Sequence, residues 1–159
     1  MIHPLTILTY VVASFFGLEY IKLEKLHWIT MDYTSAEDVR QKAEDIVQKL
    51  GMKHIDMDRV HFVRSTGSRS RWVQARIYGM GRIWLHALGI TPHYIIEVIS
   101  ERFDKLNDEL KEKIIIHELL HIPRRFSGGL VCHRQGVTKK RVEKLHNYIR
   151  TERVKQSPI

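Results

Sequence analysis

Cysteine is almost absent from this chain of 159 residues, because Cys132 is its only example. One thiol cannot form an intramolecular disulfide or a zinc site made of cysteines alone, so a disulfide-held scaffold is excluded. Glycine and proline, at nine and four residues, are too few for a collagen-like or linker-dominated chain. The length and the 43% of hydrophobic residues fit one globular domain. Because disulfides are lacking, we expect it to be cytoplasmic.

Acidic residues are missing from 59–96, which hold six arginines, and they are rare in 123–159. Residues 1–122 hold 16 basic and 16 acidic side chains, so the net charge of +8 comes from 123–159, with ten basic and two acidic side chains. These two basic zones make nucleic acid a candidate partner. A solvated basic surface explains the charge equally well.

Charged residues are also missing from 2–18, a run of 17 residues that is shorter than the ~20 of a typical membrane-spanning helix. We weigh three interpretations: a buried helix, a membrane-associated anchor, and an extension upstream of the true start. Met31 directly precedes a well-formed domain opening, which favours the extension. We therefore predict an apolar extension at 1–30, a folded domain at 31–150 and a basic tail at 151–159.

Hydrophobic periodicity predicts three helices and three or four strands. Thr34 and Glu37 are spaced as a capping box for the first helix, and Asn107 or Asp108 can cap the second. The helices are predicted at 34–50, 108–122 and 137–148, and the strands at 59–64, 72–78, 82–88 and 94–99. This order predicts an α+β domain with a small antiparallel or mixed sheet packed on helices.

A basic and aromatic face is predicted on the hairpin formed by the strands at 72–78 and 82–88. Alternation would bring five side chains together there, namely Trp72, Arg76, Tyr78, Arg82 and Trp84. Arginine and aromatic rings can bind single-stranded nucleic acid by charge and stacking. The same face could instead cover a peptide cleft or pack on the first helix.

The most informative stretch is His117-Glu118-Leu119-Leu120-His121, inside the predicted helix at 108–122. Residues four apart lie one turn apart on a helix, so His117 and His121 can bind one metal ion. Glu118 is rotated by about 100° and can act as a base beside that ion without binding it. The pattern therefore predicts two metal ligands and one general base.

A catalytic zinc site needs a third protein ligand. Ser127 stands where the pattern HExxHxxGxxH has its last histidine, so that arrangement is excluded. The candidates are His133, after a Gly-Gly loop, and Glu143 and His146 in the last predicted helix. We favour His133, because turn-forming neighbours let the loop fold back over the helix.

The stretch IIIHELLHIPRRFSGGLVCH resembles the active-site region of small zincin-like metallopeptidases of archaea and phages, with the layout of SprT-like proteases. The resemblance covers 31–150, and its specific residues lie at 93–133. It implies zinc ligation by His117, His121 and His133, with Glu118 as general base for peptide-bond hydrolysis. A cysteine-rich zinc ribbon of the kind often attached to SprT-like domains is missing.

Our main hypothesis is therefore a zinc metallopeptidase acting on peptides or proteins. The alternative is a non-enzymatic nucleic-acid-binding or partner-binding domain with a structural zinc, to which Cys132 or His146 could contribute a fourth ligand. A third reading is a zinc hydrolase acting on another bond. In zincins the strand before the active-site helix commonly lines the cleft, so we expect a peptide to add to the edge of the strand at 94–99.

Overall fold

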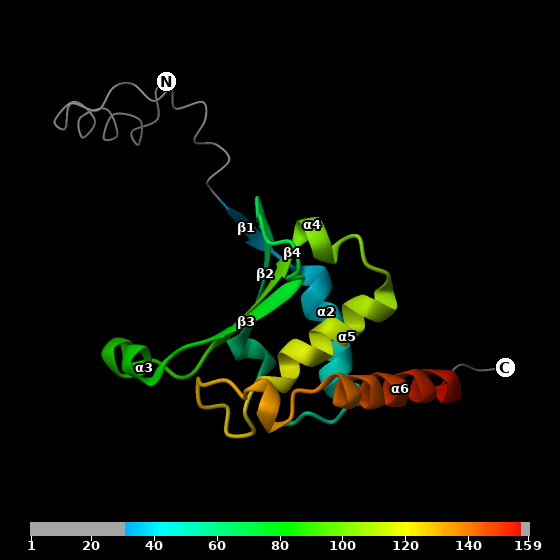
Figure 1. Ribbon diagram of the computed structural model, residues 1–159. Coiled ribbons are helices and arrows are strands. Elements are labelled where there is room, and N and C mark those ends of the chain that lie inside the picture. The colour runs from blue at the N-terminus through cyan, green and yellow to red at the C-terminus, as the bar shows by residue number, and fades with distance from the viewer. Residues whose placement is uncertain (1–30, 157–159) are drawn as a thin grey trace, which may run out of the picture. The chain divides into compact units, whose positions relative to one another are not determined.

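The computed structural model describes residues 31–156, so the predicted extension at 1–30 lies outside the described residues. Figure 1 shows how the elements are arranged. The strands are β1 (Asp32–Ser35), β2 (Val60–Thr66), β3 (Ala75–Gly79) and β4 (Tyr94–Ile99). The helices are α2 (Glu37–Lys49), α3 (Arg82–Leu88), α4 (Ser100–Phe103), α5 (Asp108–Leu120) and α6 (Lys139–Gln156), with 3₁₀ turns η2 (Met57–Arg59) and η3 (His133–Gln135).

The strands form one mixed sheet in the order β1-β2-β4-β3. β2 and β4 are parallel, with Phe62 opposite Ile96, and the two outer pairs are antiparallel. A parallel pair needs a crossover connection, and here the segment with β3 and α3 makes it. The predicted α+β class with a small mixed sheet is confirmed.

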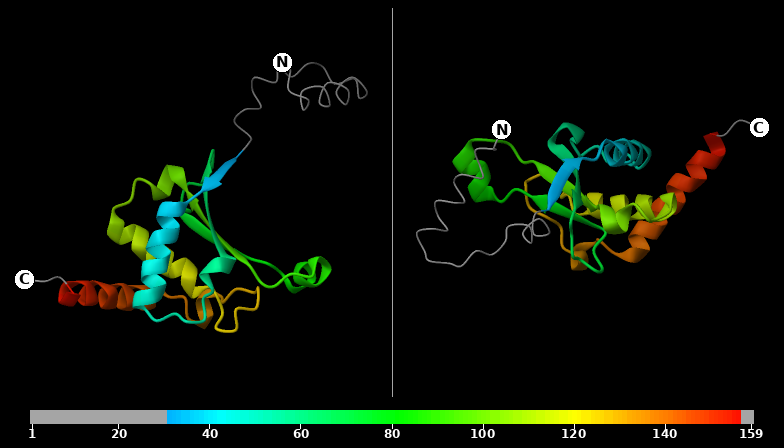
Figure 2. Two further views of the ribbon diagram at one scale, coloured as in Figure 1. Left: turned by 180° about the vertical axis from the view of Figure 1, so that it is seen from behind. Right: turned by 90° about the horizontal axis from the view of Figure 1, so that it is seen from above.

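One face of the sheet packs on α2 and α5, which lie on the same side of it in Figures 1 and 2. The sheet contributes alternate side chains to this core, and the helices contribute apolar side chains at three- and four-residue spacing. Those with no more than 6% exposure include Phe62, Ile96, Val98, Val39, Ile46, Ile115, Ile116 and Leu119. Each such side chain stabilises the fold by roughly 1.5–3 kcal/mol relative to exposure, so α5 is fixed firmly to the sheet.

The first helix begins later than predicted. Thr34 lies in β1 opposite Arg64, and the N-cap of α2 is Ala36, which makes no side-chain capping hydrogen bond. The predicted capping box is therefore wrong, because strand pairing takes the residues that would have opened the helix. Asn107 does cap α5, since its Oδ1 accepts a hydrogen bond from the N–H of Leu110 at 2.9 Å.

The strand predicted at 82–88 is wrong, because this segment is the helix α3. It ends at Gly89, whose φ of +64° and hydrogen bonds to the carbonyls of His86 and Leu85 are typical of a helix C-terminus. Trp84 is therefore on a helix and does not share a sheet face with Tyr78, so the predicted basic and aromatic hairpin face does not form. In Figure 1, α3 lies at the far end of β3 and β4, away from α2 and α5.

The other boundaries differ by smaller amounts. The strand at 94–99 is as predicted, the strand at 72–78 begins at Ala75, and the last helix continues to Gln156. Within residues 31–156, none of the helices combines the length and the apolar character that a membrane crossing requires.

Candidate metal centre

The helix α5 buries polar as well as apolar residues. Glu118 and His121 are each 7% exposed, and His117 is half-buried. A buried imidazole or carboxyl needs polar partners, because burial without them costs roughly 1–3 kcal/mol or more. His117, Glu118 and His121 are therefore placed where one shared ligand can provide the polar partner that each of them needs.

The loop after α5 returns to the end of that helix and pairs with it. The main-chain N–H of Val131 donates to the carbonyl of His121 at 2.8 Å. The Nδ1 atom of His121 lies 2.6 Å from the carbonyl oxygen of Val131. Because a carbonyl oxygen only accepts, Nδ1 carries the proton, and the lone pair of His121 is on Nε2. The loop thus fixes both the ring orientation and the tautomer.

A buried tyrosine of the sheet holds the middle of this loop. The hydroxyl of Tyr94 accepts from the N–H of Gly128 at 2.8 Å and donates to the carbonyl of Gly129 at 3.1 Å. Its ring packs edge-on against Phe126, with centroids 4.9 Å apart. Gly79 touches the same loop so closely that a Cβ atom there would collide with the carbonyl oxygen of Gly128.

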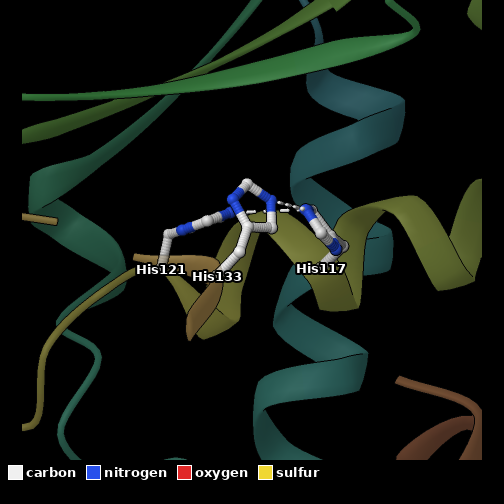
Figure 3. Close-up of side chains that lie close together, drawn as sticks. All are labelled: His117, His121 and His133. Carbon is white, nitrogen blue, oxygen red and sulfur yellow. Dashed lines mark hydrogen bonds between the residues drawn. The ribbon is translucent and has the colours of Figure 1, made fainter. Parts of the chain in front are cut away.

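These contacts bring His133, in η3, to the two histidines of α5. The Nε2 of His117 is 3.1 Å from the Nε2 of His133 and 3.3 Å from the Nε2 of His121. One ring nitrogen from each histidine lies within 4.8 Å of the other two. Figure 3 shows the three rings directed toward one another. They are the only three-residue group of this kind among the described residues that could hold a metal ion.

Burial shifts the pKa values of two groups at this site, His117 and Glu118. Burial and the neighbouring His121 and His133 lower the pKa of His117 below its ordinary value, so its imidazole is neutral and can bind a cation. Burial raises the pKa of Glu118 to about 7. A carboxyl with a pKa near neutrality can both accept and donate a proton.

The two other candidates for the third ligand have different partners. Glu143 forms an ion pair with Lys113, whose Nζ lies 2.9 Å from a carboxylate oxygen of Glu143. His146 is buried, and its Nε2 lies 3.2 Å from an oxygen of Glu112. Cys132 is exposed and is not a member of the three-histidine cluster. Of the residues weighed from the sequence, the structure therefore brings only His133 to the pair on α5.

A groove of about 470 Å³ runs beside the cluster. His117 and His133 of the cluster and the neighbouring Glu118 line it, together with the start of β3 and apolar side chains of α5 and α6. Its apolar lining consists of Val73, Ala75, Leu110, Ile114, Val137 and Val142. The cluster therefore opens onto a surface that an extended molecule can contact.

The expected role of the strand at 94–99 as a peptide-binding edge is wrong. β4 is paired on both sides, by β2 and β3, and has no free edge. Among the described strands, β1 and β3 form the edges of the sheet, and β3 is the edge strand next to the groove. Because the N–H of Ile99 donates to the carbonyl of Gln74, the antiparallel alternation directs the main-chain groups of Ala75 and Ile77 away from β4.

Three histidines that converge beside a buried glutamate form the arrangement that metal-dependent hydrolases use. A family model described as "Putative phage metallopeptidase" matches residues 31–152, and the chain belongs to this family. The family implies a metal ion and protein or peptide substrates. Searches of curated proteins and of solved structures gave no match.

Sequence reasoning missed the residues that hold the loop. Tyr94 reads as an ordinary core residue in a β-branched strand, and its hydroxyl partners lie 34 and 35 positions away. From the sequence, Gly79 is interpreted as a turn residue. In the structure it lies against Gly128, and this contact leaves no room for a side chain at position 79. The one feature of the sequence that indicates such a contact is the hydroxyl of Tyr94 in a strand rich in aliphatic residues, because a buried hydroxyl needs a hydrogen-bond partner.

We expect Tyr94→Phe to weaken metal binding by about tenfold, because the loop that carries His133 loses its anchor. The change also leaves the N–H of Gly128 unpaired, which should lower the free energy of unfolding by about 1–3 kcal/mol. Zinc competition with a chromophoric chelator and denaturant unfolding measure the two effects. Tyr148→Phe, at a half-exposed tyrosine of α6, is the matched control. Equal behaviour of the two variants would contradict the anchoring role.

Proposed function

We propose that this protein is a zinc-dependent metallopeptidase in which His117, His121 and His133 hold the ion. The observation that supports the proposal is the close approach of the Nε2 of His117 to the Nε2 atoms of His121 and His133, in a group whose ring nitrogens lie within 4.8 Å of one another. Ligand nitrogens around a tetrahedral zinc ion, at ~2.0–2.1 Å from it, lie ~3.3 Å apart. The two closest nitrogen pairs here, at 3.1 and 3.3 Å, have this spacing.

The donor set favours zinc or another transition metal over magnesium and calcium. Three imidazoles suit transition metals, whereas magnesium and calcium prefer oxygen ligands. Three protein ligands leave one position of a tetrahedral site open, as catalytic rather than structural zinc requires. The hydrogen bond from Nδ1 of His121 to the carbonyl of Val131 is the outer contact that orients a metal-binding histidine.

A zinc ion in this site would polarise the scissile carbonyl and lower the pKa of a water molecule. Glu118 lines the same groove as His117 and His133, within reach of a substrate there. In the proposed reaction its carboxylate takes a proton from the attacking water and gives that proton to the leaving amine. Burial keeps bulk water from competing for this proton.

A peptide can bind along β3. The groove includes Gln74 and Ala75, where this edge of the sheet begins. An added strand would pair with the outward main-chain groups of Ala75 and Ile77 with little dependence on sequence. The helix-loop-histidine order is that of SprT-like proteases, and the layout of this site supports the same use of the third histidine.

Glu118→Gln should abolish peptide hydrolysis while zinc stays bound, because the amide keeps the size of the carboxylate but cannot accept the proton. Zinc content by elemental analysis and cleavage of an unstructured protein such as casein give the two readouts. The rate should fall by at least a hundredfold. Cleavage at the wild-type rate, with contaminating proteases excluded, would contradict Glu118 as the base.

His133→Ala should weaken zinc binding by at least a hundredfold, since it removes one of three ligands. Glu143→Gln is the matched control, because Glu143 lines the same groove but pairs with Lys113. Its zinc affinity should change by less than threefold in the same chelator competition. If Glu143→Gln instead loses the ion and His133→Ala keeps it, the proposed ligand set is wrong.

The apolar lining of the groove favours substrates with a bulky apolar residue next to the cleaved bond. Ile114 is a partly buried member of this lining, one helical turn before Glu118. Ile114→Ser should reduce kcat/KM about tenfold for such peptides and leave peptides with glycine at that position nearly unchanged. Leu130→Ser, at an exposed residue outside the groove, is the control. An equal loss for both peptide classes would contradict the subsite.

A further inference from the structure

A second hollow, of about 640 Å³, lies beside a different part of α5. Leu119 and Leu120 line it, whereas His117 and Glu118 line the groove of the metal centre. The segment between α2 and η2, the loop after α5, η3 and α6 complete its walls. The two hollows have no lining residue in common, so this pocket is not an extension of the proposed active site.

The polar lining of this pocket is basic. Lys53 and His54 come from the segment after α2, Arg124 follows α5, and Arg141 lies on α6. None of the described residues that line the pocket is an aspartate or glutamate. Burial and the nearby Arg124 lower the pKa of His54, which agrees with a site where positive charges face one another without a counter-charge.

Cations gathered in a concavity without carboxylates favour an anion. Two guanidinium groups can each donate two hydrogen bonds to one phosphate, and they do so better than lysines alone. Gln135 adds an amide that can donate or accept. Arg124 and Arg141 also belong to the segment 123–159, which holds the net positive charge of the chain. The surrounding charge therefore also favours an anionic ligand.

The size and the apolar lining of the pocket narrow the choice of ligand further. A volume of about 640 Å³ is far larger than an inorganic oxyanion needs, and lies in the range of sites for small organic ligands. Apolar side chains also line it, among them Leu50, Leu119, Leu120, Ile122 and Leu145. We propose that the pocket binds a nucleotide, with the phosphates on Arg124 and Arg141 and the base against these apolar side chains.

The phosphates could belong to a free nucleotide or to a nucleotide unit of a nucleic acid strand. Two probes separate these sources: ADP, measured by isothermal titration calorimetry, and a fluorescein-labelled twelve-residue oligothymidylate, measured by anisotropy. A strand that also contacts basic side chains outside the pocket should bind with a steep salt dependence. ADP should show a shallower one.

The test compares full-length Arg124→Ala/Arg141→Ala with the control Arg125→Ala/Arg150→Ala, which removes two exposed cations of the same segment outside the pocket. We expect the first variant to bind ADP, or the oligonucleotide if ADP does not bind, at least tenfold more weakly than wild type. The control should stay within threefold. Binding does not depend on peptidase activity, so its outcome is separate from that of the proposed function.

Arg141 also donates to the carbonyl of Gly136, so its loss could disturb η3. Lys53→Glu avoids this difficulty, because Lys53 is exposed and its reversal places a carboxylate directly in the pocket. It should weaken the same probe at least tenfold. The proposal is overturned if wild type binds neither probe, or if the control variant loses binding as strongly as the pocket variants, which would indicate a diffuse basic surface.

Discussion

The candidate metal centre depends on one local interaction, the pairing of His121 with Val131. Two hydrogen bonds, at 2.8 and 2.6 Å, attach the returning loop to the last turn of α5. One of them fixes the main chain two residues before His133. The other sets the tautomer of His121 and turns its Nε2 toward His117. The same contact therefore positions the third histidine and prepares the second one, and neither result is available from the helix alone.

The sheet supports this interaction from the other side. Tyr94 is fully buried in β4, and its hydroxyl holds Gly128 and Gly129 in the middle of the loop. Gly79 in β3 lets the loop approach the sheet. The geometry of the histidines is thus coupled to the buried core of the sheet, so the loop does not have to order itself at the moment a ligand binds. Such preorganisation lowers the entropic cost of binding.

The sequence was informative where a local pattern decides the structure. The helix around His117 and His121 and the strand at 94–99 could be predicted because periodicity and β-branched residues act over short distances. The choice of His133 rested on the flexibility of a Gly-Gly loop, which permits a return but does not specify it. The segment 82–88 was misassigned because its apolar residues fit both periods, and its terminal Gly89 decided for a helix. The free edge of β3 depends on strand order, which no local pattern contains.

The 3₁₀ turn η3 contributes a lining residue to each of the two hollows. His133, its first residue, faces the groove of the metal centre, and Gln135, its last, lines the basic pocket. The two residues share one short turn of main chain, so a ligand that shifted the main chain at Gln135 would also shift His133. By linkage, a metal ion on His133 would then change the affinity of the pocket for that ligand by the same factor as the ligand changes the affinity for the metal. The loop after the HELLH stretch thus has two roles in this fold: it completes the histidine cluster and it joins that cluster to the most basic part of the chain.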